Sequence, residues 1–257
     1  MSEHVRIAVA DGVMTLTIDR PDKRNALTNA MYGALSEGLR SAAEDGAVRV
    51  VIIEGEGGFF TAGNDLGDFA AVASGTLKRD NMNVGGFLPR LAAFPKPLVA
   101  AVEGVAVGIG TTMLLHCDLV FAAEDARLST PFVDLALVPE AASSLLLPAR
   151  IGYARAFSMF ALGEVITGAR AAEIGLANRA LPAGEVRPAA QGAARTLARK
   201  AAGALVATKA LLRDPAGLTE RIRVEREVFD ARLRSPEARE AFQAFAEKRK
   251  PDFSRLG

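Results

Sequence analysis

Residues 96–118 read KPLVAAVEGVAVGIGTTMLLHCD, and this stretch decides the fold class. Its first part, up to Val102, is a run of mostly small and β-branched apolar residues, which is typical of a strand buried on both faces. The glycines at positions 104, 108 and 110 allow tight turns, and an apolar helix is predicted to begin at about Ile109. A buried strand that leads through a glycine turn into a helix is a building unit of an α/β domain.

The same rhythm extends on both sides of this stretch. Two alternating segments around Asp11-Gly12 predict a hairpin, Thr28 is expected to cap a helix, and residues 48–57 predict another buried strand. Three further predictions are two helices broken near Ser74-Gly75 that end before Pro95, a strand and turn over 119–131, and a helix from Pro139 to about Arg150. From Gly184 onward the pattern is helical. We therefore expect an α/β core over residues 1–183 and a helical region over residues 184–257.

Composition excludes several classes of function. The net charge of +1 supplies no field for nucleic acid or anionic membranes, and no run of eighteen apolar residues is present. The first residues lack the pattern of a signal peptide, and the single Cys117 cannot form an internal disulfide, so a cytoplasmic protein is expected. Two histidines, His4 and His116, are too few for a usual zinc site, and we expect no metal.

The glycine turn at 104–110 does not match a nucleotide-binding loop, because neither the spacing G-x-G-x-x-G nor a lysine after the last glycine is present. The first amides of a helix that begins near Ile109 would instead point at a developing oxyanion. FTAGND, residues 60–65, is a second loop of this kind. Two such loops, each with one amide, would form a two-donor oxyanion hole. The alternative is that these glycines only permit sharp turns.

Four segments in chain order resemble the signature segments of the crotonase (enoyl-CoA hydratase/isomerase) superfamily. They are RPDKRNAL (20–27), FTAGNDLGDF (60–69), residues 94–131, and ALGEVITGARAAEIGLANRAL (161–181). The resemblance implies a spiral of β-β-α units with a helical trimerisation region, in a homotrimer or a dimer of trimers. It also implies an acyl-CoA thioester substrate from fatty acid metabolism, with no cofactor beyond this coenzyme A. The matching oxyanion-hole positions are Asn64 and Ile109, which would act through backbone N–H groups.

The catalytic carboxylate is assigned through the same resemblance. Hydratases of the family use two glutamates, but the matching positions here hold Thr112 and Phe132, and neither side chain is a base. TPFVDLALVPEAASS, residues 130–144, is similar to the Δ3,Δ2-enoyl-CoA isomerases of peroxisomal type, in which one glutamate, matched by Glu140, moves the proton. On spacing alone, Glu140 could instead be a residue of a helix's first turn, stabilised by the helix dipole. Asp134 is expected to fix a turn.

Substrate contacts follow from the resemblance too. Coenzyme A is expected along residues 61–66, with contacts at Ala26, Ala62, Asp65 and Leu66 and with Arg24 near its phosphates. Phe245 and Lys248 match positions that reach the coenzyme A of a neighbouring subunit, and Phe132, Leu135 and Leu137 are expected to line an acyl pocket. The alternatives are a solvated loop charge for Arg24 and an ordinary amphipathic helix around Phe245.

Three functions remain open at this point. The first is an isomerase that moves a C3–C4 double bond to C2–C3. The second is an enoyl-CoA hydratase or another acyl-CoA reaction of the superfamily. The third is an acyl-CoA-binding scaffold without turnover, which the absence of both hydratase glutamates also fits.

Overall fold

The computed structural model describes residues 2–65, 67–68, 82–254 and 256. Its strands are β1 (Val5–Ala10), β2 (Val13–Ile18), β3 (Val50–Gly55), β4 (Leu98–Val102), β5 (Val105–Val107), β6 (Leu119–Ala123), β7 (Arg127–Ser129), β8 (Ile166–Thr167) and β9 (Arg179–Leu181). Its α-helices are α1 (Asn29–Glu44), α3 (Val84–Ala92), α4 (Ile109–Thr112), α5 (Ser143–Ile151), α6 (Tyr153–Ala161), α7 (Gly168–Glu173), α8 (Ala183–Ala198), α9 (Ala202–Leu212), α10 (Pro215–Leu233) and α11 (Pro236–Ala246). Short 3-10 helices are η1 (Pro21–Lys23), η3 (Met113–His116) and η4 (Val133–Leu135).

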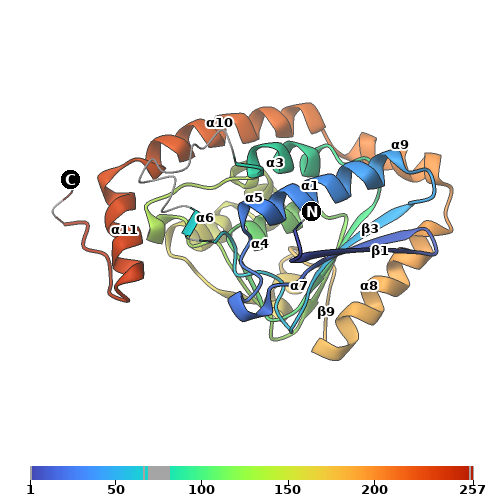
Figure 1. The fold of residues 1–257 in the computed structure, drawn as a ribbon, viewed down its shortest axis with the longest axis horizontal. Coiled ribbons are helices and arrows are strands. Elements are labelled where there is room, and N and C mark those ends of the chain that lie inside the picture. Colours follow the sequence, from blue (N-terminus) through green and yellow to red (C-terminus); the bar gives the residue numbers. More distant parts are fainter. Residues whose placement is uncertain (1, 66, 69–81, 255, 257) are drawn as a thin grey trace.

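A six-stranded sheet in the order β1-β2-β3-β4-β6-β9 forms the centre of the fold. β1 and β2 pair antiparallel around the predicted turn, and the remaining neighbours are parallel. Every residue of β3 and β4 is buried, as their continuous apolar sequences predict. Figure 1 shows α8 along one side of this sheet, with α1 and α3 on the other.

A second, three-stranded sheet in the order β5-β7-β8 positions the loops of the site. The chain leaves β4, turns at Gly104 and enters β5, so that consecutive strands belong to different sheets. Repetition of this step from sheet to sheet is the predicted β-β-α pattern, and the α/β fold class is confirmed.

Among the described residues, the core consists of two apolar clusters. The larger one fills the space between the main sheet and its helices. The smaller one joins η4 to the end of α10 and to α11 through Phe132, Leu137, Phe229, Leu233 and Phe242. Since burying one such side chain contributes about 1.5–3 kcal/mol, this smaller cluster is sufficient to fix η4 against the helices. Figure 1 shows α11 at the end of the molecule away from the main sheet.

Most predicted elements are present, with one clear correction. The Thr28 hydroxyl caps α1 by accepting a hydrogen bond from the amide of Met31 at 3.4 Å. The predicted helix start at Pro139 is wrong, because α5 begins at Ser143. The predicted break near Ser74-Gly75 lies outside the described residues. The region after Gly184 is helical as expected, although α8 packs on the main sheet.

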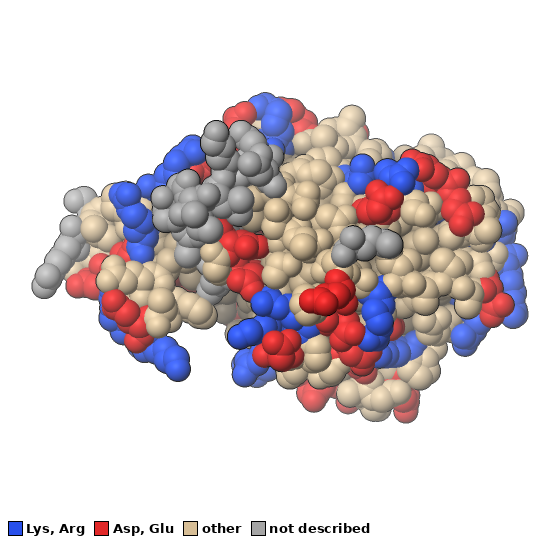
Figure 2. Space-filling view, viewed as in Figure 1, with Lys and Arg blue, Asp and Glu red and all other residues tan. Residues whose placement is uncertain are grey.

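Figure 2 shows basic and acidic side chains next to one another in several groups, with uncharged surface between these groups. None of the helices in the described ranges is both long and apolar enough to cross a lipid bilayer.

Candidate active site

The loop that leaves β3 lies between two other segments of the chain. On one side, the amides of Ala62 and Asp65 donate to the carbonyls of Arg24 and Leu27, each at 2.9 Å. On the other side, the Thr61 amide donates to Val105 at 2.9 Å and the Val107 amide donates back to Thr61 at 3.0 Å. These bonds bring the two glycine loops of the sequence side by side.

Two glycines make this close approach possible. Gly63 has a φ of +91°, and a Cβ there would stand 2.7 Å from the Val107 carbonyl oxygen. A Cβ at Gly110 would stand 2.8 Å from the Thr61 methyl group and 2.9 Å from the Thr61 carbonyl oxygen. Real Cβ atoms do not approach other atoms so closely, so any side chain at either position would push the loops apart.

The two predicted oxyanion donors lie on these loops. Ile109 is the first residue of α4, and within that helix its amide has no partner, because the first bonds to Gly108 come from Thr111 and Thr112. In the described part of the chain, neither the Ile109 amide nor the Asn64 amide donates to a protein acceptor. The Asn64 side chain is fixed separately, since its Oδ1 accepts from the buried Tyr32 hydroxyl at 2.5 Å.

Glu140 lies against the same helix. Its residue is only 9% exposed, and its Oε1 accepts a hydrogen bond from the Thr112 hydroxyl at 2.6 Å. Thr112 is the last residue of α4, one turn after Ile109. The helix that presents the Ile109 amide therefore also orients the carboxylate.

The backbone just after Glu140 has an unusual conformation. Ala141 and Ala142 both have left-handed backbones, with φ of 60° and 56°, which end any helix that began at Pro139. His116 holds this turn from one side through its Nε2 atom, 2.7 Å from the Ala141 carbonyl oxygen. The reading of Glu140 as a residue of a helix's first turn is therefore wrong, because the helix begins three residues later.

Glu225, from α10, holds the same turn from the other side. Its carboxylate accepts from the amides of Ala142 at 2.6 Å and Ser144 at 2.9 Å, and also from the Ser144 hydroxyl. The residue is 6% exposed, and this burial raises the pKa of Glu225. Sequence reasoning missed it, although a signal exists. Position 225 falls within the buried stripe of α10, with Leu218, Ile222, Phe229 and Leu233.

A cavity of about 40 Å³ adjoins Glu140 and Asn64. Its other described lining residues are Val84, Gly85 and Leu88 from α3, Ala141, and Ile222, Arg226 and Phe229 from α10. Within this lining set, Glu140 is the only carboxylate and Arg226 the only cation. The cavity thus joins the predicted base and one predicted oxyanion-hole residue, whereas Ile109, fully buried at the start of α4, is not among its described lining residues.

The opposite end of the α4–η3 segment is held by two arginines. Arg150 donates to the carbonyls of Leu114 at 3.5 Å and Leu115 at 3.3 Å. Arg213 donates to the carbonyls of Leu115 at 3.3 Å and Cys117 at 3.5 Å. Cations at a helix C-terminus are favourable, and here they anchor the segment that begins with the Ile109 amide.

The predicted coenzyme A contacts gather around the Asn64 loop. Ala26 and Ala62 are half-buried, and Arg24 is exposed at the end of η1. The Asp65 carboxylate accepts hydrogen bonds from Arg20, at 2.6 Å, and from the Gly67 amide. Burial alone would raise the pKa of Asp65, but these hydrogen bonds outweigh burial, so the pKa is lowered. The Arg20 pair, which sequence reasoning missed, makes Asp65 a residue that fixes the loop. Leu66 lies outside the described residues.

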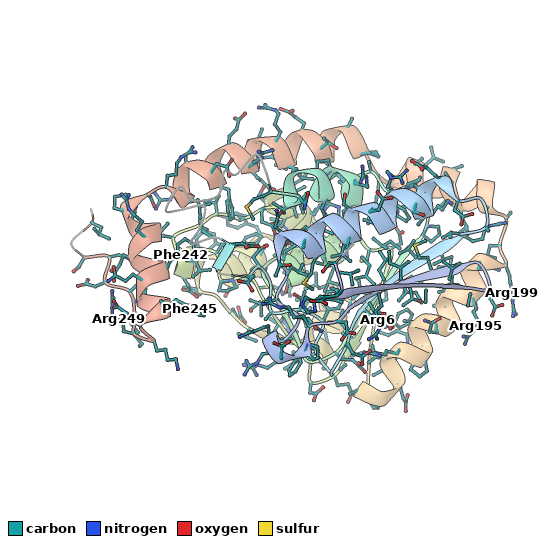
Figure 3. The ribbon with its side chains drawn as sticks, viewed as in Figure 1. Arg6, Arg195, Arg199, Phe242, Phe245 and Arg249 are labelled. Atoms are coloured by element: carbon teal, nitrogen blue, oxygen red, sulfur yellow. The ribbon has the colours of Figure 1, made fainter. Side chains whose placement is uncertain are left out.

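The predicted acyl-pocket residues and the two distal residues lie elsewhere. Phe132 and Leu137 belong to the smaller apolar cluster and Leu135 packs against it, and none of the three lines the cavity beside Glu140. Phe245, on α11, is 60% exposed, and Lys248 is exposed just after that helix. Figure 3 shows Phe242 and Phe245 at the end of the molecule opposite Arg195 and Arg199.

The remaining titratable groups of interest are structural. Complete burial lowers the pKa of His116 to about 4 and raises the pKa of Cys117 to about 12, so neither is a base or a nucleophile at neutral pH. No cluster of three histidine, cysteine or acidic residues suited to a metal ion occurs among the described residues.

Comparisons with known proteins point to one family. The family model for enoyl-CoA hydratase/isomerase matches residues 8–255. A 1,2-epoxyphenylacetyl-CoA isomerase of Escherichia coli K12 is 34% identical over 99% of both chains, and a 2,3-dehydroadipyl-CoA hydratase of that bacterium is 36% identical over 94% of both. Enoyl-CoA delta isomerase 2 of Rattus norvegicus is 35% identical over 70% of this chain and 47% of its own length. The structure of Pseudomonas aeruginosa OdaA is 47% identical, with a TM-score of 0.90 over 95% of this chain and 99% of that one.

Proposed function

The chain belongs to the enoyl-CoA hydratase/isomerase family, and from that premise we propose that it is a Δ3,Δ2-enoyl-CoA isomerase with Glu140 as its single acid–base group. The broader assignment of the chain as an acyl-CoA hydratase/isomerase follows from the family itself. One observation carries the finer proposal. A single carboxylate borders the described cavity, and a threonine hydroxyl holds it from the position at which a hydratase would carry a second glutamate.

The proposed reaction moves one proton across three carbons. The Glu140 carboxylate takes a proton from C2 of the 3-enoyl thioester, and the electrons of the C2–H bond form a C1–C2 double bond. The product is a dienolate, conjugated with the C3–C4 double bond, whose negative charge lies mainly on the thioester oxygen. The amides of Asn64 and Ile109 stabilise that oxygen, and each such donor typically contributes about 10²–10³ in rate. The protonated Glu140 then returns its proton to C4, which leaves the double bond at C2–C3.

Coenzyme A enters this proposal only as part of the substrate. Its chain would follow the loop of Ala62 and Asp65 beside Ala26, with Arg24 near the phosphates and with Phe245 and Lys248 reaching a neighbouring subunit. An exposed arginine suits this role because its planar guanidinium donates paired hydrogen bonds to phosphate.

The decisive experiment compares a 3-enoyl-CoA with the matching 2-enoyl-CoA. The wild-type protein should convert the 3-enoyl ester into its 2-enoyl isomer, with an absorbance change and no change in mass. Glu140→Gln should lower this rate about 10²–10⁴-fold, as expected for loss of a general base. Glu227→Gln is a matched control, since Glu227 is an exposed glutamate on α10. Full activity of Glu140→Gln, or a product heavier by one water, would refute the proposal.

An isotope experiment tests the single-base feature separately. A substrate deuterated at C2 should give a product that retains part of its deuterium at C4, because the same carboxyl group removes and returns the label. If all of the label were replaced by solvent hydrogen from the first turnover, we would abandon a single-carboxylate shuttle.

A further inference from the structure

Tyr32 holds the side chain of a residue whose amide is assigned to the oxyanion hole. Its hydroxyl donates to Oδ1 of Asn64 at 2.5 Å, at the short end of the range for O–H donors. Tyr32 is only 1% exposed, whereas Asn64 borders the cavity beside Glu140. We propose that Tyr32 is a positioning residue, which keeps the Asn64 side-chain oxygen away from the two amides of the oxyanion hole. This inference rests on the proposed function, because that function assigns these amides to the thioester oxygen.

The backbone around Asn64 directs its amide away from the start of α1. Residue 64 forms a parallel β-bridge with Leu27. In this bridge the Leu27 amide donates to Gly63 at 2.8 Å, and the Leu27 carbonyl accepts from the amide of residue 65 at 2.9 Å. Both bonds belong to Leu27, so the amide of Asn64 itself points to the opposite side of the loop. β5 packs on that side, since a Cβ on Gly63 would stand 2.7 Å from the last carbonyl oxygen of β5.

An asparagine at this position carries an acceptor that can compete with the substrate. Asparagine side chains readily accept hydrogen bonds from their own or neighbouring backbone amides. In the part of the chain that the structure describes, the amides of Asn64 and Ile109 donate to no protein acceptor. Without the Tyr32 bond, Oδ1 would therefore compete for a donor that the reaction needs. The Tyr32 hydroxyl occupies Oδ1 from the side of α1, which leaves both amides to the thioester oxygen.

The position of Tyr32 is fixed by helix packing. Its amide donates to the carbonyl of Thr28, the N-cap of α1, at 3.1 Å. Its ring centre lies 5.4 Å from that of Phe87, with the two planes at 58°, and Phe87 is fully buried on α3. Tilted aromatic pairs of this separation are favourable. Since Tyr32→Phe keeps the ring and removes only the hydroxyl, this variant tests the hydrogen bond and leaves the packing in place.

The first experiment asks whether the effect of Tyr32 passes through the Asn64 side chain. Tyr32→Phe should lower kcat/KM for isomerisation about tenfold or more, because a hydrogen bond between Oδ1 and an amide shifts an equilibrium by about that factor. Adding Asn64→Ala, which keeps the backbone amide and removes the competing oxygen, should recover most of this loss. Tyr153→Phe is the matched control, since Tyr153 is the other tyrosine of the chain and is 72% exposed.

Two kinetic results would overturn the inference. The first is a Tyr32→Phe protein with the kcat/KM of the wild type. The second is a double variant no faster than Tyr32→Phe, because losses caused by damage to the fold do not recover when a second side chain is removed.

A second experiment does not need turnover. The probe is 3-ketohexanoyl-CoA, which loses a C2 proton to solvent and becomes an enolate with its own ultraviolet absorbance. The negative charge of this enolate lies partly on the thioester oxygen, as in the proposed dienolate. The fraction of bound probe in the enolate form should be lower for Tyr32→Phe than for the wild type, and Asn64→Ala should restore it in the double variant. Free coenzyme A, which lacks the thioester oxygen, should bind to the wild type and Tyr32→Phe with equal affinity.

The two experiments separate this inference from the proposed function. If the wild type isomerises no 3-enoyl ester but the enolate fraction falls in Tyr32→Phe and recovers in the double variant, the inference stands and the proposed function fails. If isomerisation is observed but Tyr32→Phe changes neither kcat/KM nor the enolate fraction, the inference alone fails. Weaker binding of free coenzyme A by Tyr32→Phe would make Tyr32 a structural residue of the binding loop and would also overturn the inference.

Discussion

Thr112 defines how the Glu140 carboxylate is presented to a substrate. Its hydroxyl donates at 2.6 Å to Oε1, and it comes from the same short helix as the Ile109 amide. The base and the oxyanion donor are therefore held in register by one rigid element.

We predict that Thr112→Val lowers kcat for isomerisation about tenfold or more, because a hydrogen bond to a charged group contributes about 1.5–3 kcal/mol. KM should change little, since the hydroxyl does not form part of the predicted coenzyme A contacts. Thr112→Ser, which keeps the donor, should retain most of the rate. Steady-state kinetics decide the matter, and a Val variant as fast as the wild type would show that Glu140 does not need this bond.

His116 makes stability depend on pH. Its folded-state pKa of about 4 lies below the ordinary 6.5. Between these two pH values, the unfolded chain therefore binds a proton at His116 that the folded protein does not bind. Its contribution to the free energy of unfolding is complete above pH 6.5 and is lost as the pH falls towards 4. Between pH 7 and pH 5 the loss should be about 2 kcal/mol.

Urea unfolding at these two pH values measures the effect. His116→Gln can still donate a hydrogen bond to the Ala141 carbonyl. In this variant, the fall in the free energy of unfolding between pH 7 and pH 5 should be smaller by about this amount. If the free energy of unfolding fell equally in the variant and the wild type between these pH values, another group would be the cause of the loss at low pH.

At the scale of elements, the turn between Glu140 and α5 depends on α10. The Glu225 carboxylate accepts hydrogen bonds from the amides of Ala142 and Ser144, which the start of α5 would otherwise leave without partners. The carboxylate also stabilises two left-handed alanines, whose conformation costs about 1–2 kcal/mol each. The position of Glu140 is thus set by a helix much later in the chain.

We expect Glu225→Gln to lower the free energy of unfolding by about 2 kcal/mol, because one side of the amide is a donor that faces backbone donors. The same variant should lower kcat more than it raises KM, since it moves the base and leaves the coenzyme A loop intact. Denaturant unfolding and kinetics on one preparation test both effects. A variant with lower stability but unchanged kcat would show that Glu225 supports the fold alone.

The sequence could predict the parts of the site that depend on local pattern. Glycine spacing located both loops, and continuous apolar runs identified β3 and β4. The start of α5 could not be predicted, because alanine is the best helix former and its left-handed backbone here is imposed by Glu225 and His116. Tyr32, Arg20 and Arg226 were missed for a related reason, since each reaches the site across the fold.

At the scale of the whole molecule, several apolar side chains remain on the surface of a single chain. Tyr153, Phe157 and Leu162 on and just after α6 are exposed, as is Phe245 on α11. Exposed apolar groups of this size commonly mark an interface between subunits. These side chains are therefore candidates for a subunit interface, and the homotrimer or dimer of trimers stays a prediction.

Each chain has a mass of 27.0 kDa. Light scattering should therefore report about 81 kDa for a homotrimer, or about twice that mass for a dimer of trimers. Phe245→Glu should shift the population towards smaller species or weaken coenzyme A binding, because it places a charge at the expected contact. A wild-type monomer that is fully active when dilute would contradict the assembly.

The hydrogen bonds from Ala142 and Ser144 to Glu225 have a consequence for biosynthesis. The acceptor lies 83 residues beyond Ala142, so the ribosome completes the main sheet well before it makes the group that shapes the turn after Glu140. A nascent chain that has emerged only as far as α8 holds both glycine loops but neither the Arg213 anchor nor the α10 wall of the cavity. Docking of α10 is therefore the step that completes the turn after Glu140 and the wall of the cavity beside it.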